Sequence, residues 1–396
     1  MGGKPSTIDP KSFMWPSEPP RMSGNDLDAL LEHLSQFDVS DITFQTNQPV
    51  IAEIYGDLRH ITLRQLTNTE VGDILNFIYG QNGTTRLLSG QDIDTSYDFR
   101  ADRSTRFRYR VNGTACQVDG HDAIQITMRT IQTDPLPLAS LGLPEKILKA
   151  ISPEDGCVYI TGATGSGKST LLASTIRYIV EQEDANRKVL TYEAPIEFVY
   201  DDVSAPSSII SQSEIPRHLP SFADGVRNAL RRKPRLIMVG EARDYNTINA
   251  VLEAALTGHP VYTTVHSNGV AETVRRLVGS FGSDEVRGKT IDIIDTMRLV
   301  IWQKLVPTVD GKLTALREYL VFDDDVRSKL LQVDPDNVTA ATRQIVIDQK
   351  NTMLDSASEA YKSGIISKSV YDKLVLRHES ANLDLKQKPS KRKSDD

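Results

Sequence analysis

One run of eight residues constrains the fold of this chain more than any other feature, because residues 162–169 read GATGSGKS. The run matches the pattern G-x-x-x-x-G-K-[ST] in full, which is typical of a phosphate-binding loop between a strand and a helix. Its glycines let the main chain curl so that successive N–H groups point inward at phosphate oxygens. The residues predicted to contact a nucleotide's phosphates are Gly162, Ala163, Thr164, Gly165, Ser166, Gly167, Lys168, Ser169 and Thr170.

The segments on both sides of this loop support the same interpretation. Residues 157–160 form a short apolar run typical of a buried strand, and the apolar residues after the loop recur at helical spacing. Lys168 would place its charge near the β- and γ-phosphates, and the Ser169 hydroxyl would ligate Mg²⁺. ATP and Mg²⁺ are therefore the predicted ligands. The alternative is a Gly- and Ser-rich turn that matches the pattern by chance.

The pattern of apolar residues divides the chain into an α+β part and an α/β part. Short apolar runs alternate with helical segments from about residue 141 to about 322, which is typical of a parallel sheet in an α/β domain. The predicted divisions are a disordered arm over 1–22, a small α+β domain over 23–132, a linker over 133–140, a P-loop domain over 141–338, a helical segment over 339–380 and a charged flexible tail over 381–396.

Individual strands and helices can be predicted from local periodicity. In the α+β part the expected strands cover 41–45, 50–55, 58–63, 106–117 and 123–131, with helices after Ser23 and over 69–79. In the α/β part the expected strands cover 157–160, 189–192, 236–239 and 261–264.

Composition argues against several classes of protein. The chain of 396 residues has 46 basic and 53 acidic side chains, so it lacks the basic excess of a nucleic-acid-binding protein. Its two cysteines, Cys116 and Cys157, lie in apolar runs and predict buried thiols in a reducing compartment. The N-terminal residues contain no apolar signal segment, and no apolar run reaches the length of a membrane span. We therefore expect a cytoplasmic protein that meets a membrane only through partners.

Acidic residues follow two of the predicted strands. Glu241 comes just after strand 236–239, where a P-loop enzyme needs a carboxylate to hold Mg²⁺ or to activate the attacking water. Because Gly240 precedes it in place of an aspartate, Glu241 is favoured as the base. Glu193 and Glu197 follow strand 189–192, where α/β proteins bind ligands, and Glu193 is a candidate metal ligand, directly or through a water. The alternative for all three carboxylates is a solvated surface charge.

Cationic candidates lie on other predicted strands. His266 follows strand 261–264 and is placed to sense the γ-phosphate, although a structural histidine fits the pattern equally well. Arg108 and Arg110 alternate along one strand and Arg129 lies on the next. Such arginines can act on a neighbouring subunit's nucleotide by neutralising the transferring phosphoryl group. A basic solvated face is the alternative interpretation.

Taken together, these motifs resemble the secretion and type IV pilus motor ATPases, the PilT-like superfamily. Residues 162–169 resemble its Walker A, 191–197 (TYEAPIE) its Asp box, 236–244 (LIMVGEARD) its Walker B, 263–267 (TTVHS) its His box, and 108–112 with Arg129 its N-terminal arginines. The resemblance covers roughly residues 24–320, and residues 211–241 resemble most the type IVB (Dot/Icm) secretion ATPases and their conjugative-plasmid relatives. Ala194 stands where the family usually has Asp, which leaves Glu193 and Glu197 to carry the Asp-box role.

The resemblance implies a RecA-like P-loop domain preceded by a PAS-like domain and followed by a helical segment. It also implies a homohexameric ring, with Glu241 as the catalytic glutamate, that couples ATP hydrolysis to protein secretion beside inner-membrane components. The alternatives are a pilus retraction or assembly ATPase, and a nucleotide-switched assembly adaptor with little turnover. Nucleic acid is not an expected substrate.

Overall fold

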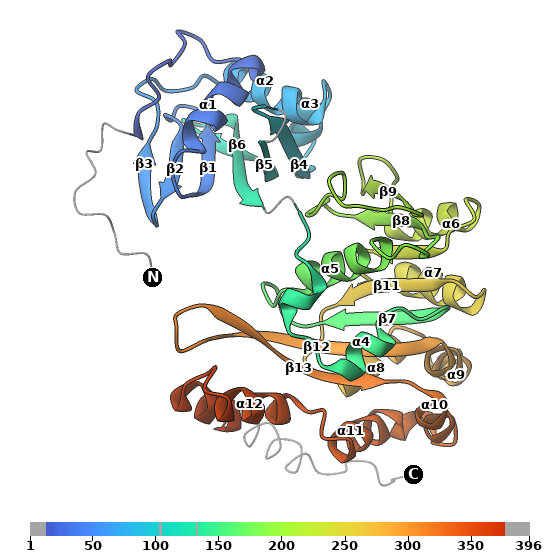
Figure 1. Cartoon of the computed structure of the whole chain (residues 1–396). Coiled ribbons are helices and arrows are strands. Elements are labelled where there is room, and N and C mark those ends of the chain that lie inside the picture. The colour runs from blue at the N-terminus through green and yellow to red at the C-terminus, as the bar shows by residue number, and fades with distance from the viewer. Residues whose placement is uncertain (1–12, 103–104, 132–133, 377–396) are drawn as a thin grey trace, which may run out of the picture. The chain divides into compact units, whose positions relative to one another are not determined.

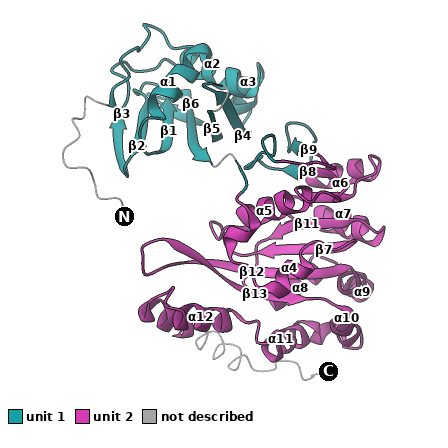
Figure 2. Cartoon of the chain, in the orientation of Figure 1, with its two compact units in different colours: residues 1–135, 192–203, 212–221 teal, residues 136–191, 204–211, 222–396 magenta. Residues whose placement is uncertain are grey.

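The computed structural model describes residues 13–102, 105–131 and 134–376, which form two compact units (Figures 1 and 2). Unit 1 contains the chain up to residue 135 together with segments 192–203 and 212–221, and unit 2 contains the remainder. In sequence, the two inserted segments of unit 1 lie within the predicted α/β domain. Local periodicity does not indicate that they belong to unit 1. The predicted tail over 381–396 lies outside the described residues.

Unit 1 is built on an antiparallel sheet of six strands in the order β3-β2-β1-β6-β5-β4. The strands are β1 Val39–Gln45, β2 Ile51–Ile54, β3 Asp57–His60, β4 Ile93–Arg100, β5 Arg106–Val118 and β6 His121–Ile131, and the helices are α1 Leu27–Leu34, α2 Asn68–Tyr79 and α3 Gly83–Leu88. Helix α1 buries its four leucines on one face, as its spacing predicts. The Thr67 hydroxyl caps α2, and the Glu70 side chain completes a capping box.

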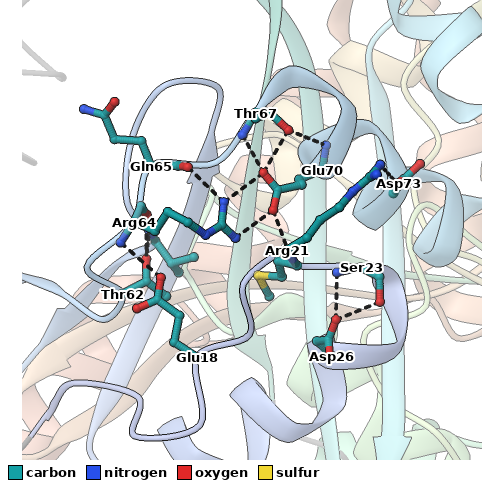
Figure 3. Close-up of polar contacts among 12 residues, drawn as sticks. Glu18, Arg21, Ser23, Asp26, Thr62, Arg64, Gln65, Thr67, Glu70 and Asp73 are labelled. Carbon is teal, nitrogen blue, oxygen red and sulfur yellow. Dashed lines mark hydrogen bonds and ion pairs between the residues drawn. The ribbon is translucent and has the colours of Figure 1, made fainter.

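Residues 13–22 correct the expectation of a disordered arm over residues 1–22. Phe13, Trp15 and Met22 are at most 6% exposed and belong to the core of unit 1. The Trp15 N–H donates to the Ile61 carbonyl at 2.8 Å, and the Glu18 carboxylate accepts from two main-chain N–H groups (Figure 3). Prolines exclude regular structure here, but an extended chain can still bury aromatic side chains. We call residues 13–22 the N-terminal strap.

Unit 2 is built on a mixed sheet in the order β13-β12-β7-β11-β10-β8-β9, whose last two strands reach into the inserted segments of unit 1. The strands are β7 Gly156–Thr161, β8 Lys188–Glu193, β9 Ile209–Glu214, β10 Leu236–Val239, β11 Pro260–Val265, β12 Met297–Pro307 and β13 Leu313–Val321. Strands β10, β11, β7 and β12 are parallel neighbours, and β13 runs antiparallel to β12. The predicted α/β class is therefore confirmed, with an antiparallel edge that local periodicity missed.

Helices pack along this sheet and at its β13 edge (Figure 1). They are α4 Glu145–Ala150, α5 Lys168–Val180, α6 Phe222–Leu230, α7 Tyr245–Leu256, α8 Val270–Val278, α9 Val286–Thr296, α10 Asp324–Leu331, α11 Val338–Asp348 and α12 Met353–Lys362. Helix α11 contacts α8 and α12 contacts β13, so the C-terminal helices form part of unit 2. Within the described residues, no helix combines the length and the apolar character needed to cross a bilayer.

Candidate nucleotide site

The loop between β7 and α5 has the backbone geometry that its sequence predicts. Gly162, Gly165 and Gly167 have φ values of 147°, 75° and 81°, a region in which other residues are strained. A Cβ atom at Gly162 would lie 2.5 Å from the Gln303 carbonyl oxygen, so the close approach of β12 also requires glycine there. The loop is therefore curled, and β12 packs closely against its first glycine.

Lys168 is the first residue of α5, and its ammonium group is held over the loop. The Nζ atom donates to the Gly162 and Ala163 carbonyl oxygens at 3.0 and 2.8 Å. The N–H groups of the first turn of α5 have no acceptor within the helix, and a helix N-terminus favours an anion. Among the described residues, the buried Ser166 hydroxyl has no hydrogen-bond partner. The donors present therefore fit the phosphates of a nucleotide.

A magnesium ion fits this site only with ligands from the substrate. The structure places the half-buried Ser169 on the first turn of α5, where its hydroxyl can serve as one oxygen ligand. No group of three or more His, Cys, Asp or Glu side chains among the described residues is arranged to hold a metal ion. This agrees with the usual coordination of Mg²⁺, which binds one or two protein groups together with phosphate oxygens and water.

Glu241 and His266 follow neighbouring parallel strands, β10 and β11, and therefore lie at the same edge of the unit 2 sheet as the loop after β7. The His266 Nε2 atom is 3.6 Å from a Glu241 carboxylate oxygen. The Thr264 hydroxyl donates to the Gly240 carbonyl at 2.6 Å, which fixes the turn that carries Glu241. The structure thus brings together Lys168, Glu241 and His266.

The charge state of His266 follows from its surroundings. Burial lowers the pKa of His266 most, and the positive charges of Lys168 and Arg276 lower it further, whereas Glu241 acts in the opposite direction. The net effect is a pKa below the usual value of 6.5, so the imidazole is neutral at pH 7. A neutral imidazole can donate from one nitrogen and accept at the other.

The two Asp-box carboxylates, Glu193 and Glu197, lie in a segment that belongs to unit 1. Glu193 ends β8, is 6% exposed and accepts a hydrogen bond from the Gln212 side chain at 3.0 Å. The Glu197 side chain is partly exposed, and its nearest ion-pair partner, Arg110 Nη1, is 3.8 Å away. Their assignment to metal or water positioning stays a prediction.

The three predicted arginines differ in their surroundings. Arg108 is 3% exposed and donates to the main-chain carbonyl oxygens of Ile196 and Glu197 at 2.8 and 2.6 Å. Arg110 pairs with Asp94 at 2.6 Å, and Arg129 pairs with Asp41 at 2.9 Å while its side chain stays 68% exposed. The alternative of a solvated basic face is therefore wrong for Arg108, because its guanidinium is buried against main-chain acceptors.

Two polar residues that contact the loop or its support are absent from the sequence predictions. Gln303 on β12 donates to the Ser166 carbonyl, and Arg317 on β13 donates to Gln303. Gln303 directly follows the apolar run 299–302 (LVIW). A polar residue at the end of such a run was the sequence signal that could have identified it as a buried, hydrogen-bonded side chain.

The whole chain was compared with known protein families, solved structures and characterised relatives. Residues 94–380 match the family described as "Type II/IV secretion system protein". The X-ray structure of the Legionella pneumophila ATPase DotB aligns with a TM-score of 0.88 and 61% identity, covering 92% of this chain and 98% of that one. The pilus retraction motor PilT with bound ADP aligns with a TM-score of 0.73 and 28% identity, covering 86% and 94%. The "Twitching motility protein" of Neisseria gonorrhoeae is 34% identical over 315 residues, 79% of this chain and 81% of that protein.

Proposed function

Since the chain belongs to the type II/IV secretion system protein family, we propose that it is a DotB-like motor that couples ATP hydrolysis to protein secretion through a type IV secretion system. The observation that carries this proposal is the shared sheet edge at which Lys168, Glu241 and His266 meet the phosphate-binding loop. The sequence identity of 61% with DotB favours secretion over pilus retraction, the activity named for PilT, which is 28% identical.

The residues of the loop bind and orient the substrate. The amides at the start of α5 hold the phosphates, and Lys168 exchanges its carbonyl acceptors in the loop for phosphate oxygens. When bound, Mg²⁺ neutralises charge on the phosphate oxygens. Glu241 accepts a proton from the attacking water as the new P–O bond forms, and the bond to ADP breaks. The neutral His266 beside Glu241 can hydrogen-bond a γ-phosphate oxygen.

Several finer features belong to the same proposal. We infer a homohexameric ring in the cytoplasm, held at the inner membrane by partner proteins, with a PAS-like unit 1 and a RecA-like unit 2. Glu193 and Glu197 would position the metal or its water, and Arg110 and Arg129 would act on the nucleotide of a neighbouring subunit. For Arg108 we propose a different role from the predicted one, namely holding the main chain of the Asp box through residues 196 and 197.

Steady-state phosphate release from purified protein with ATP and Mg²⁺ tests the proposal. Glu241→Gln removes the proton acceptor but keeps the shape, so turnover should fall by about 100-fold or more while ATP binding persists. The matched control is Glu253→Gln, because Glu253 is an exposed residue of α7 whose side chain contacts Asn249. Equal turnover in wild type and Glu241→Gln would refute the assigned role. Tight ATP binding with negligible wild-type turnover would favour a nucleotide-switched adaptor instead.

A further inference from the structure

Two buried polar side chains of unit 2 have no part in the chemistry described above. Gln303 on β12 and Arg317 on β13 are 3% and 6% exposed. They are register partners across the antiparallel strand pair, and the Arg317 Nε atom donates to Gln303 Oε1 at 2.9 Å. Burial of polar groups inside a sheet opposes folding unless each group is satisfied, so the remaining partners of this pair are informative.

One end of the pair holds the phosphate-binding loop. The Gln303 Nε2 atom donates to the Ser166 carbonyl oxygen at 2.8 Å. A Cβ atom at Gly167 would lie 2.8 Å from the same Nε2 atom, and a Cβ atom at Gly162 would lie 2.5 Å from the Gln303 carbonyl oxygen. Gln303 therefore touches both ends of the glycine-rich turn, through its side chain and its main chain.

The other end of the pair holds the segment through which the chain enters unit 2. The Arg317 guanidinium donates to the main-chain carbonyl oxygens of Leu141 and Gly142 at 2.9 and 3.4 Å. Leu141 ends the short helix η3, Leu138–Leu141, which begins two residues after the division between the units and also contacts α5. Burial lowers the pKa of Arg317 to about 10, so the guanidinium stays charged at neutral pH.

We propose that Gln303 and Arg317 are positioning residues that link the state of the phosphate-binding loop to the segment joining the two units. The planar amide of Gln303 donates at one end and accepts at the other, so a displaced Ser166 carbonyl changes the position of the Arg317 partner as well. Arg317 in turn changes its hold on residues 141 and 142. The inference rests on the proposed function, since it requires that the loop binds a nucleotide.

Hydrogen exchange of the full-length protein with and without Mg-ADP tests the link. In the wild type, ADP should slow amide exchange in peptides covering residues 136–144, although these residues lie outside the loop. Gln303→Glu keeps the side-chain shape and the acceptor for Arg317, but it replaces the donor that faces Ser166 with an acceptor. This variant should still bind ADP, lose the protection at 136–144, and show a KM for ATP raised by about tenfold.

Two further variants separate linkage from simple support. Arg317→Lys keeps the charge but cannot reach Gln303 and the carbonyl oxygens of residues 141 and 142 together, so it should lose protection at 136–144 with a smaller change in KM. Gln332→Glu makes the same chemical change at an exposed position after α10 and should behave as wild type.

The outcomes distinguish the two proposals. Wild-type protein that binds ADP without any change in exchange at 136–144 would overturn the link and leave the proposed function standing, even if every variant failed to fold. Protection that survives in a folded Gln303→Glu protein would also overturn it. A wild type that binds neither ATP nor ADP would remove the proposed function first.

Discussion

Two groups of charged residues, one in each unit, show opposite arrangements. In unit 1 the Glu70 carboxylate is 1% exposed and accepts hydrogen bonds from the Arg64 guanidinium, from Thr67 and from the Met22 main chain, all within 3.0 Å (Figure 3). In unit 2 the Glu241 side chain is 30% exposed, and the Nε2 atom of the neutral His266 imidazole lies 3.6 Å from its carboxylate.

The difference between the two groups separates support from ligand binding. Burial acts to raise the pKa of Glu70, but hydrogen bonds from Arg64, Thr67 and Met22 outweigh it and hold the pKa at about 2. A carboxylate whose acceptor positions are filled can fix the N-terminal strap but cannot bind a ligand. Glu241 keeps accessible oxygen atoms at the sheet edge that carries the phosphate-binding loop, as a proton acceptor must.

Substitution of Lys168 gives the largest expected effect and tests the unit 2 side of the comparison. Lys168→Ala removes the charge at the loop, so turnover should fall by about 100-fold or more. Thermal stability should change little, because the ammonium group contacts carbonyl oxygens of a loop that is itself partly exposed. Phosphate release and a melting curve, measured on the same preparation, check both statements.

The control for this substitution is Lys149→Ala. Lys149 is an exposed residue of α4 that pairs with Glu145, and surface pairs of this kind contribute little. A Lys168→Ala protein that melts far below the wild type would show that Lys168 supports the fold, and the contrast with Glu70 would fail.

Substitution of Glu70 tests the unit 1 side. Glu70→Gln removes the negative charge that holds Arg64 and the strap, so the free energy of unfolding of unit 1 should fall by about 3 kcal/mol at pH 7. Trp15 lies on the strap and reports its release, and a Trp302→Phe background removes the second of the chain's two tryptophans. Urea unfolding followed by Trp15 fluorescence measures the change, with Glu32→Gln on the exposed face of α1 as the matched control.

The same substitution has a defined pH dependence. The pKa of Glu70 is about 2 in the folded protein, below its usual 4.5, so its stabilising contribution is complete above about pH 5. The contribution is lost as the pH falls toward 2, because the unfolded carboxylate takes up its proton first. The stability difference between wild type and Glu70→Gln should therefore shrink between pH 5 and pH 2. A difference that stays constant over this range would contradict the assigned ionisation of Glu70.

The parts of the molecule that the sequence predicts best are those encoded by adjacent residues. Strand β7, the glycine loop and the start of α5 follow from one continuous motif. Strands β10 and β11 are short and entirely buried, and β10 is apolar throughout. Strand β4 was missed because five of the eight residues in IDTSYDFR are polar, as an edge strand tolerates. The strap was missed because its burial depends on partners some 45 residues away, such as the contact of Glu18 with Leu63.

The candidate site shows the same limit. Lys168 and Glu241 could be assigned because each follows a recognisable strand, and parallel strands bring their carboxyl ends to one edge. The roles of Gln303, Arg317 and Arg108 could not be assigned from the sequence. Each side chain donates to main-chain carbonyl oxygens, and the sequence does not show which carbonyl groups lie nearby. Residue type predicts a charge, but only the fold shows whether that charge is already satisfied.

The smallest expected effect concerns two arginines that the sequence treats alike. Arg108→Gln leaves the carbonyl oxygens of residues 196 and 197 without a buried donor, so the free energy of unfolding of unit 1 should fall by about 2 kcal/mol. Arg129→Gln removes an exposed ion pair with Asp41 and should lower it by less than about 1 kcal/mol. Urea unfolding in the Trp302→Phe background, followed by Trp15 fluorescence, compares the two.

Turnover of the assembled protein then separates support from catalysis in this pair. If Arg129 acts on a neighbouring subunit's nucleotide, Arg129→Gln lowers phosphate release while stability is nearly unchanged, because an exposed guanidinium is available to a second subunit. Arg108 is already bound to main-chain acceptors. Any loss of turnover in Arg108→Gln should therefore be accompanied by a loss of stability. Equal losses of stability for both variants would mean that burial does not distinguish charges that stabilise unit 1 from charges that are available to a ligand. The comparison between Glu70 and Glu241 would then fail.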